Sequence, residues 1–130
     1  MAIDGGFKEY LTELFEPVGS VTFKNMFGGT GIFRHGLMFG LVMDDRVALK
    51  VDGETEQNFL DEGMEQWTYS REGDTKEGER GTRKRSFGYW YMPERLMEDA
   101  EELREWALKA FDVAVRADMK KPPSKRKLQG

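Results

Sequence analysis

The sequence of 130 residues contains no cysteine and a single histidine, His35. The absence of cysteine excludes disulfide bonds, thiolate zinc sites and a cysteine nucleophile. His35 stands beside Gly36 in a predicted turn, with no second histidine or cysteine to complete a metal site and no nucleophile at a readable spacing. We therefore expect no metal site, and we interpret His35 as a solvent-facing turn residue.

Long apolar runs are also missing. No stretch approaches the roughly 20 apolar residues that a membrane-spanning helix needs, and residues 1–6 do not begin a signal peptide. The lack of cysteine suits a reducing compartment, so we expect a cytoplasmic protein that does not enter a membrane. The formal net charge of −4 argues against attraction of nucleic acid to the surface as a whole.

Catalytic motifs are absent as well. The glycine cluster at residues 28–31 does not continue as a dinucleotide fingerprint, because Arg34 stands where the third glycine belongs and strand-type residues follow. The sequence has no P-loop and no G-x-S-x-G motif, so we expect neither an enzyme nor a cofactor. A turn or a bulge is the favoured role of the glycines in this region, Gly28, Gly29, Gly31 and Gly36.

The sequence is rich in short alternating segments bounded by turn residues. An apolar stripe predicts an amphipathic helix from Phe7 to Val18, with Asp4 as its N-cap. Four strands are predicted next, over residues 21–27, 32–34, 37–43 and 46–51, with the glycine cluster breaking the first from the second. Tight turns are expected at residues 35–36 and 44–45.

The second half of the sequence predicts two more helices and two more strands. A short helix over residues 54–62 would bury Phe59 and Leu60. A strand that begins at Trp67 would pair antiparallel with residues 87–92, and Pro93 would open a long helix. The order α-β-β-β(-β)-α-β-β-α predicts an α+β fold with an antiparallel sheet.

Two segments lack the apolar residues needed for a core. Residues 71–85 include no aliphatic or aromatic side chain and are predicted to form a mobile loop, and residues 119–130 form a basic tail that we expect to be disordered. The folded domain would then span residues 1–118. A solvated loop and a solubilising tail are favoured over contact with phosphates. The candidate nucleic-acid contacts are Arg80, Arg83, Lys84, Arg85, Lys120, Lys121, Lys125, Arg126 and Lys127.

Aromatic residues concentrate on the two late strands. Alternate residues of a strand point to opposite faces, so Trp90 is expected on one face and its neighbours on the other. One set can fill the core, and the other would be partly exposed, where it can contact a protein or stack on bases. A core or dimer contact is favoured over a ligand surface. The candidate residues are Trp67, Tyr69, Tyr89, Trp90 and Tyr91.

A succession of short motifs resembles the N-terminal domain of the TfoX/Sxy family. The motifs are Phe27-Gly28-Gly29-Thr30-Gly31-Ile32-Phe33, then Gly36-Leu37-Met38-Phe39-Gly40-Leu41, Ala48-Leu49-Lys50-Val51-Asp52 and Tyr89-Trp90-Tyr91-Met92-Pro93. The resemblance covers roughly residues 7–117. It implies a compact α+β domain, similar to secretion-chaperone-like folds that often dimerise, and it carries over no catalytic residue.

The resemblance also implies a function. Sxy/TfoX proteins are positive regulators of competence genes for DNA uptake, regarded as acting with a cyclic-AMP-responsive activator at promoters. Full-length members have a second, C-terminal domain similar to helix-hairpin-helix modules, and here a basic tail follows the long helix instead. We therefore expect a stand-alone, non-catalytic accessory regulator that forms a homodimer and binds a transcription activator or RNA polymerase. The alternative is direct, low-specificity binding of nucleic acid through the basic loop and tail.

Overall fold

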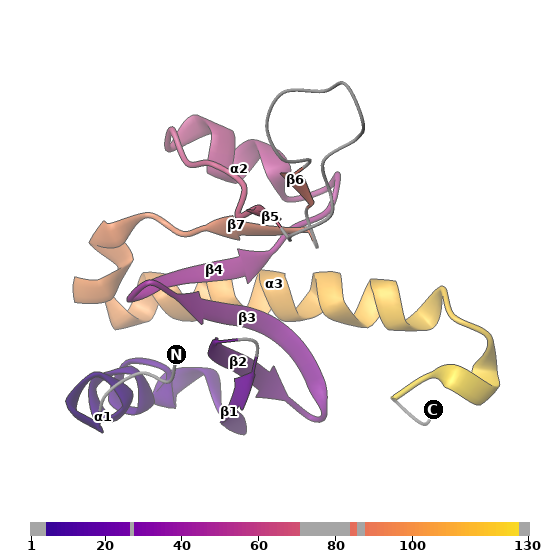
Figure 1. The fold of residues 1–130 in the computed structure, drawn as a ribbon, viewed down its shortest axis with the longest axis horizontal. Coiled ribbons are helices and arrows are strands. Elements are labelled where there is room, and N and C mark those ends of the chain that lie inside the picture. The colour runs from indigo at the N-terminus through magenta and orange to yellow at the C-terminus, as the bar shows by residue number, and fades with distance from the viewer. Residues whose placement is uncertain (1–4, 27, 71–83, 86–87, 128–130) are drawn as a thin grey trace.

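The chain folds into a main antiparallel sheet with helices packed against it (Figure 1). The computed structural model describes residues 5–26, 28–70, 84–85 and 88–127. Five strands pair in the order β1-β2-β3-β4-β7, and a separate two-stranded sheet pairs β5 with β6. Every pairing is antiparallel. The predicted α+β class is therefore confirmed.

The elements have the following bounds. The α-helices are α1 (Gly5–Leu14), α2 (Glu56–Asp61) and α3 (Ala100–Met119), and the 3-10 turns are η1 (Glu16–Val18), η2 (Glu94–Glu98) and η3 (Pro123–Lys125). The strands are β1 (Val21–Met26), β2 (Gly29–Arg34), β3 (Leu37–Met43), β4 (Arg46–Lys50), β5 (Tyr69–Ser70), β6 (Lys84–Arg85) and β7 (Tyr89–Tyr91). No helix of the described residues is both long enough and apolar enough to cross a membrane.

Two tight turns set the register of β2, β3 and β4. His35 and Gly36 have φ angles of 51° and 81°, and Asp44 and Asp45 have φ angles of 53° and 59°. Positive φ at both central residues gives a two-residue hairpin the twist that its flanking strands need. The turns predicted at residues 35–36 and 44–45 are thus confirmed.

The glycine cluster belongs to the sheet instead of interrupting it before Ile32. β2 begins at Gly29, and Gly31 pairs with Lys24 on one side and Leu41 on the other. The strand thus begins three residues before the expected start at Ile32, because glycine has no side chain with which to show the alternation of a strand. Pairing on both sides holds these glycines in the extended conformation despite their low strand propensity.

A bulge in β3 decides which of its side chains enter the core. Ile32 lies opposite Gly40 but Phe33 lies opposite Met38, so Phe39 is the extra residue. As a result Phe39 joins the main core, while Met38 contacts a second cluster on the opposite side of the sheet.

All three α-helices contribute to the core on one face of the sheet. Figure 1 shows α3 running behind β3 and β4. The ring of Phe39 lies 6.4 Å from that of Phe15, which follows α1, and 6.2 Å from that of Phe111 in α3. From α2, Phe59 reaches the ring of Trp90 at 6.2 Å. The buried residues of this main core include Leu11, Ile32, Val42, Leu49, Leu96, Leu103, Ala107 and Ala110.

Two expectations about the helices were wrong. Leu60 is 47% exposed, because the six residues of α2 turn only one side, that of Phe59, toward the core. The long helix begins at Ala100, not at Pro93. Asp99 is its N-cap and accepts a hydrogen bond from the backbone N–H of Glu102 at 3.1 Å. The residues after Pro93 form η2 instead. Their pattern of acidic and apolar residues is compatible with either an α-helix or a 3-10 helix.

Residues 120–127 turn back toward the end of α3. The backbone N–H of Lys127 donates to both carboxylate oxygens of Asp118, at 2.9 and 3.1 Å, and Asp118 is 1% exposed. Arg126 donates to the carbonyls of Met119 and Lys121. The buried carboxylate of Asp118 thus ties this segment to the end of α3. Of the loop predicted over residues 71–85, residues 71–83 lie outside the described part, and Lys84–Arg85 form β6.

Candidate functional site

The face of the sheet opposite the α-helices is the candidate site. We call it the helix-free sheet face. Within the described residues no α-helix packs on it, and a small cluster of Leu41, Ala48, Trp67 and Tyr89 is buried there. Five apolar or aromatic side chains of this face remain only half-buried: Met26, Phe33, Met38, Met43 and Tyr91. Strand alternation and the cross-strand pairs place all five on the same side.

The methionine side chains of this face lie against the backbone of two glycines in β2. A Cβ atom at Gly31 would lie 2.7 Å from Met26 Sδ, 2.8 Å from Phe33 Cε1 and 3.1 Å from Met38 Sδ. A Cβ atom at Gly29 would overlap Met43 Sδ and the carbonyl oxygen of Val42. The bare backbone at these two positions therefore lets long, flexible side chains lie flat across the sheet. The predicted role of the cluster as a turn applies to Gly28, with a φ angle of 76°, and to Gly36.

Two cations of β4 lie over the tyrosine rings of β7. Arg46 Cζ is 3.6 Å from the ring centroid of Tyr91, and Lys50 Nζ is 4.9 Å from that of Tyr89. The register explains both contacts, because Lys50 is directly opposite Tyr89 and Tyr91 is opposite Ala48, beside Arg46. These distances are typical of cation–π interactions. Positive charge is therefore held at fixed places beside the apolar side chains of this face.

Burial changes the acid–base behaviour of this face. It raises the pKa of the Tyr89 hydroxyl to about 12. The same desolvation lowers the pKa of the Lys50 ammonium, and the positive charge of Lys121 lowers it further. The Tyr89 hydroxyl donates a hydrogen bond to the carbonyl of Met38 at 3.3 Å. At neutral pH this hydroxyl is a neutral donor that ties β7 to β3.

The five aromatic candidates do not form one surface. Trp67 and Tyr89 are buried in the small cluster, Tyr91 is half-buried beside them, and Trp90 points to the helix side, as the alternation predicted. The backbone N–H of Trp67 donates to the Tyr89 carbonyl at 2.8 Å, and the backbone N–H of Tyr91 donates to the Glu65 carbonyl at 3.0 Å. Residues 65–67 therefore lie along the outer edge of β7. Tyr69 lies in β5, opposite Arg85 of β6.

The basic candidates are spread over separate parts of the chain. Arg80 and Arg83 lie outside the described residues, and Lys84 and Arg85 form β6. The remaining five follow α3, where Lys120, Lys121, Lys125 and Lys127 are exposed and Arg126 is half-buried. The structure therefore places the described tail cations in the segment that follows α3, where Lys121 is close enough to Lys50 to lower the pKa of its ammonium.

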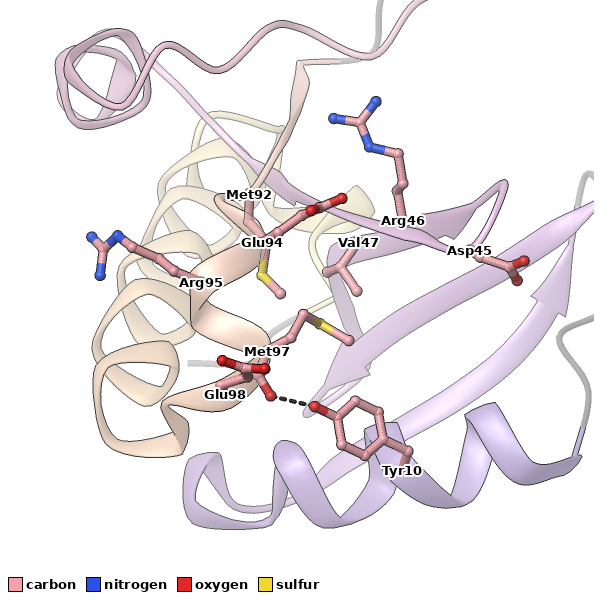
Figure 2. A pocket seen from close by; sticks show the side chains of 9 residues that line it. All are labelled: Tyr10, Asp45, Arg46, Val47, Met92, Glu94, Arg95, Met97 and Glu98. Atoms are coloured by element: carbon pink, nitrogen blue, oxygen red, sulfur yellow. Dashed lines mark hydrogen bonds between the residues drawn. The ribbon is translucent and has the colours of Figure 1, made fainter.

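A pocket of about 410 Å³ lies between α1, η2 and the start of β4 (Figure 2). Val47, Met92 and Met97 line it with apolar groups, and the Tyr10 hydroxyl donates to the Met97 carbonyl. The other lining residues are Asp45, Arg46, Glu94, Arg95 and Glu98. Figure 2 shows the two guanidinium groups pointing to opposite sides.

Arg95, which lies in η2, is engaged outside this pocket. Arg95 forms ion pairs of 2.7 Å with Glu62 and 2.8 Å with Glu102. Its hydrogen bonds hold the pKa of both carboxyls below the ordinary range. Arg95 thus joins η2 to Glu62 and α3, while Tyr10 joins α1 to η2 within the pocket.

The remaining site predictions concern His35 and possible metal ligands. His35 is exposed in its turn, with its ring 6.0 Å from that of Phe111. Within the described part of the chain, no group of three His, Cys, Asp or Glu side chains could hold a metal ion. The sequence interpretation did not single out the methionines, Arg46 or Lys50. The alternation of residues 46–50 carried a signal, since it places both cations on the face opposite Val47 and Leu49.

The fold thus defines an α+β domain whose sheet has one helix-covered face and one helix-free face. The family model of the TfoX N-terminal domain matches residues 13–114, and no other domain was detected in the chain. The chain belongs to the TfoX N-terminal domain family. Comparison with curated proteins gave no match. The matched residues include every strand of the sheet and most of α3, so the helix-free sheet face lies within the family domain.

Proposed function

We propose that this chain is a non-catalytic regulatory domain that acts by binding another protein through the helix-free sheet face. Membership of the TfoX N-terminal family fits a competence-related regulatory domain. We further propose a transcription activator or RNA polymerase as the partner. The observation that carries the proposal is the group of five half-buried apolar side chains on a sheet face without a helix.

The chemistry of this face favours a protein partner. Methionine is unbranched and polarisable, so a surface with Met26, Met38 and Met43 can adapt to the shape of another protein. Contiguous exposed apolar surface that is bordered by charged groups is typical of interaction sites. Binding would remove this surface from water, and the apolar area buried would stabilise the complex.

Nucleic acid is less well suited to this face. Bases stack on open aromatic rings, whereas Arg46 and Lys50 already lie over Tyr91 and Tyr89. Nucleic-acid binding remains the second candidate function, because the tail exposes Lys120, Lys121 and Lys125. It predicts an affinity that falls steeply with salt and is lost when residues 120–127 are removed. Unchanged binding after that removal would refute the second candidate.

A homodimer is also proposed, and its contact cannot be strand pairing along the outer edge of β7. The main-chain groups of Tyr89 and Tyr91 at that edge already bond to residues 65–67. Strand addition by a second copy would therefore use another edge of the sheet, such as β1.

The function can be tested with matched methionine substitutions. Met38→Gln and Met43→Gln together make the helix-free sheet face polar, while Met119→Gln makes the same change at a 48% exposed position on α3. Each variant replaces the natural chain in its host, and transcripts are measured for genes that respond to deletion of the chain. We expect the double variant to behave like the deletion and Met119→Gln to behave like the natural chain. Normal regulation by a folded double variant would contradict the proposal.

A further inference from the structure

Lys50 is a half-buried cation without a carboxylate partner among the described residues. Its ammonium lies over the ring of Tyr89, and no described side chain forms an ion pair with it. The neighbouring charge that affects it most is another cation, Lys121. A partly desolvated charge gains most from a partner that brings the opposite charge to it. Among the described residues, Lys121 is paired with Asp118 at 3.6 Å, whereas the charge of Lys50 has no carboxylate partner.

Arg46 carries a second fixed charge on the same strand. Its guanidinium stacks on Tyr91, and a stacked guanidinium keeps its N–H groups free at the rim of the plane, where carboxylates bind in a bidentate way. Asp44 and Glu65 lie close enough to Tyr91 to influence its pKa, so positive charge is partly balanced here. Lys50, two residues beyond Ala48, is consequently the cation that should discriminate more strongly between negatively charged and neutral partners.

The apolar side chains lie next to these cations. Leu41 and Ala48, which are paired across β3 and β4, are buried between the methionines and the tyrosines. Met38, Met43 and Tyr91 pack against this cluster and remain half-buried. A partner must therefore offer apolar groups for the methionines and an anion for Lys50 at the same time.

We propose that the helix-free sheet face selects an extended protein segment that presents both apolar and carboxylate side chains on one side, at every second residue, with one carboxylate bound by Lys50. This inference rests on the proposed function and adds the chemistry of the partner. Arg46 and Lys50 are four residues apart on β4, and side chains four residues apart along an extended segment lie on one side of it at the same spacing, so an extended segment fits both cations. A polynucleotide would satisfy the cations and leave the methionine surface uncovered.

Fluorescence anisotropy with defined probes tests this inference. The probes are a labelled peptide that carries leucine, aspartate and phenylalanine at every second residue, so that all three lie on one side when it is extended, the same peptide with asparagine for aspartate, and an oligothymidylate of similar length. The proteins are the natural chain, Lys50→Met, Lys50→Glu and the control Lys109→Glu, which changes an exposed lysine of α3. Thermal unfolding of each variant checks that it is folded.

We expect the natural chain to bind the aspartate peptide about tenfold more tightly than the asparagine peptide, the effect of one charge-assisted hydrogen bond. Lys50→Met should remove this preference, Lys50→Glu should reverse it, and Lys109→Glu should keep it. Equal affinity for the two peptides would overturn the inference, as would tighter binding of the oligothymidylate or no binding of the aspartate peptide.

Failure of the inference can be separated from failure of the proposed function. If both peptides bind equally and Met38→Gln with Met43→Gln abolishes both, the face binds protein without selecting carboxylates. If that double substitution changes the binding of neither peptide, the face is not the binding surface and the proposed function fails as well.

Discussion

Gly29 and Gly31 lie on the same strand and the same face, yet we expect very different effects when each is replaced by alanine. At Gly29 the new methyl group would overlap the Val42 carbonyl oxygen, a main-chain atom of the adjacent strand. β2 and β3 would have to separate there. At Gly31 the three nearest atoms belong to the ends of Met26, Phe33 and Met38, which can rotate away.

The magnitudes follow from these contacts. Overpacking costs about 1–3 kcal/mol, and a strained ladder hydrogen bond costs about 1 kcal/mol more. The reduced entropy of the unfolded chain returns about 0.4–1 kcal/mol to any Gly→Ala change. Gly29→Ala should therefore lower the free energy of unfolding by about 3 kcal/mol, and Gly31→Ala should stay within about 1 kcal/mol of the natural chain.

Thermal unfolding followed by circular dichroism measures this difference. For a chain of this length, 1 kcal/mol corresponds to about 4 °C in Tm, so Gly29→Ala should lower Tm by about 10 °C and Gly31→Ala by less than about 4 °C. Adding Met43→Ala to Gly29→Ala should not restore stability, since the Val42 carbonyl remains. Equal Tm values for the two single variants would refute this account of the sheet.

Three further predictions concern the helix cap, an ion pair and the assembly. Asp99→Ala should lower the free energy of unfolding by about 1 kcal/mol in a urea titration, because the cap of α3 is lost; an unchanged midpoint would contradict the cap. Arg116 bonds to Asp52 at 2.8 Å and holds the pKa of that carboxyl below its ordinary value of 3.8. The pair therefore stabilises the fold above that pH, and this contribution to stability is lost as the pH falls through the lowered pKa. Asp52→Asn should therefore cost about 1 kcal/mol at pH 7, with its Tm deficit shrinking in acid below 3.8, and a deficit that does not change with pH would refute the pairing. Light scattering over a range of concentrations should show a dimer, and a particle of 15.0 kDa at every concentration would exclude it.

Much of the fold could be predicted because its signals are local. The alternation of Val47 and Leu49 with polar residues, and the turn residues at 35–36 and 44–45, indicated the hairpins correctly. The start of β2 and the start of α3 were missed for different reasons. Gly29 has no side chain that could show the alternation of a strand. Asp99 caps α3 because its backbone is not helical, with a φ angle of −137°, and in the sequence nothing distinguishes it from the other acidic residues around it.

The candidate site was harder to predict because it depends on which face the helices cover. Along β3, apolar residues occupy both faces, since the bulge at Phe39 sends Met38 and Leu41 to one side and Phe39 and Val42 to the other. A continuous apolar segment of this kind does not reveal its exposed side. The tyrosines of β7 could therefore be predicted from the sequence, whereas the methionines and cations that complete the face could not.

The central claim is that the helix-free sheet face is the surface that binds a protein partner. In-cell photo-crosslinking tests it most directly, with a photoreactive amino acid placed at Met43 on this face or at Met119 on α3. The account predicts a crosslinked protein partner from position 43, lost when Met38→Gln is added, and none from position 119. Crosslinking from position 119 alone, or adducts from position 43 that contain only nucleic acid, would contradict it.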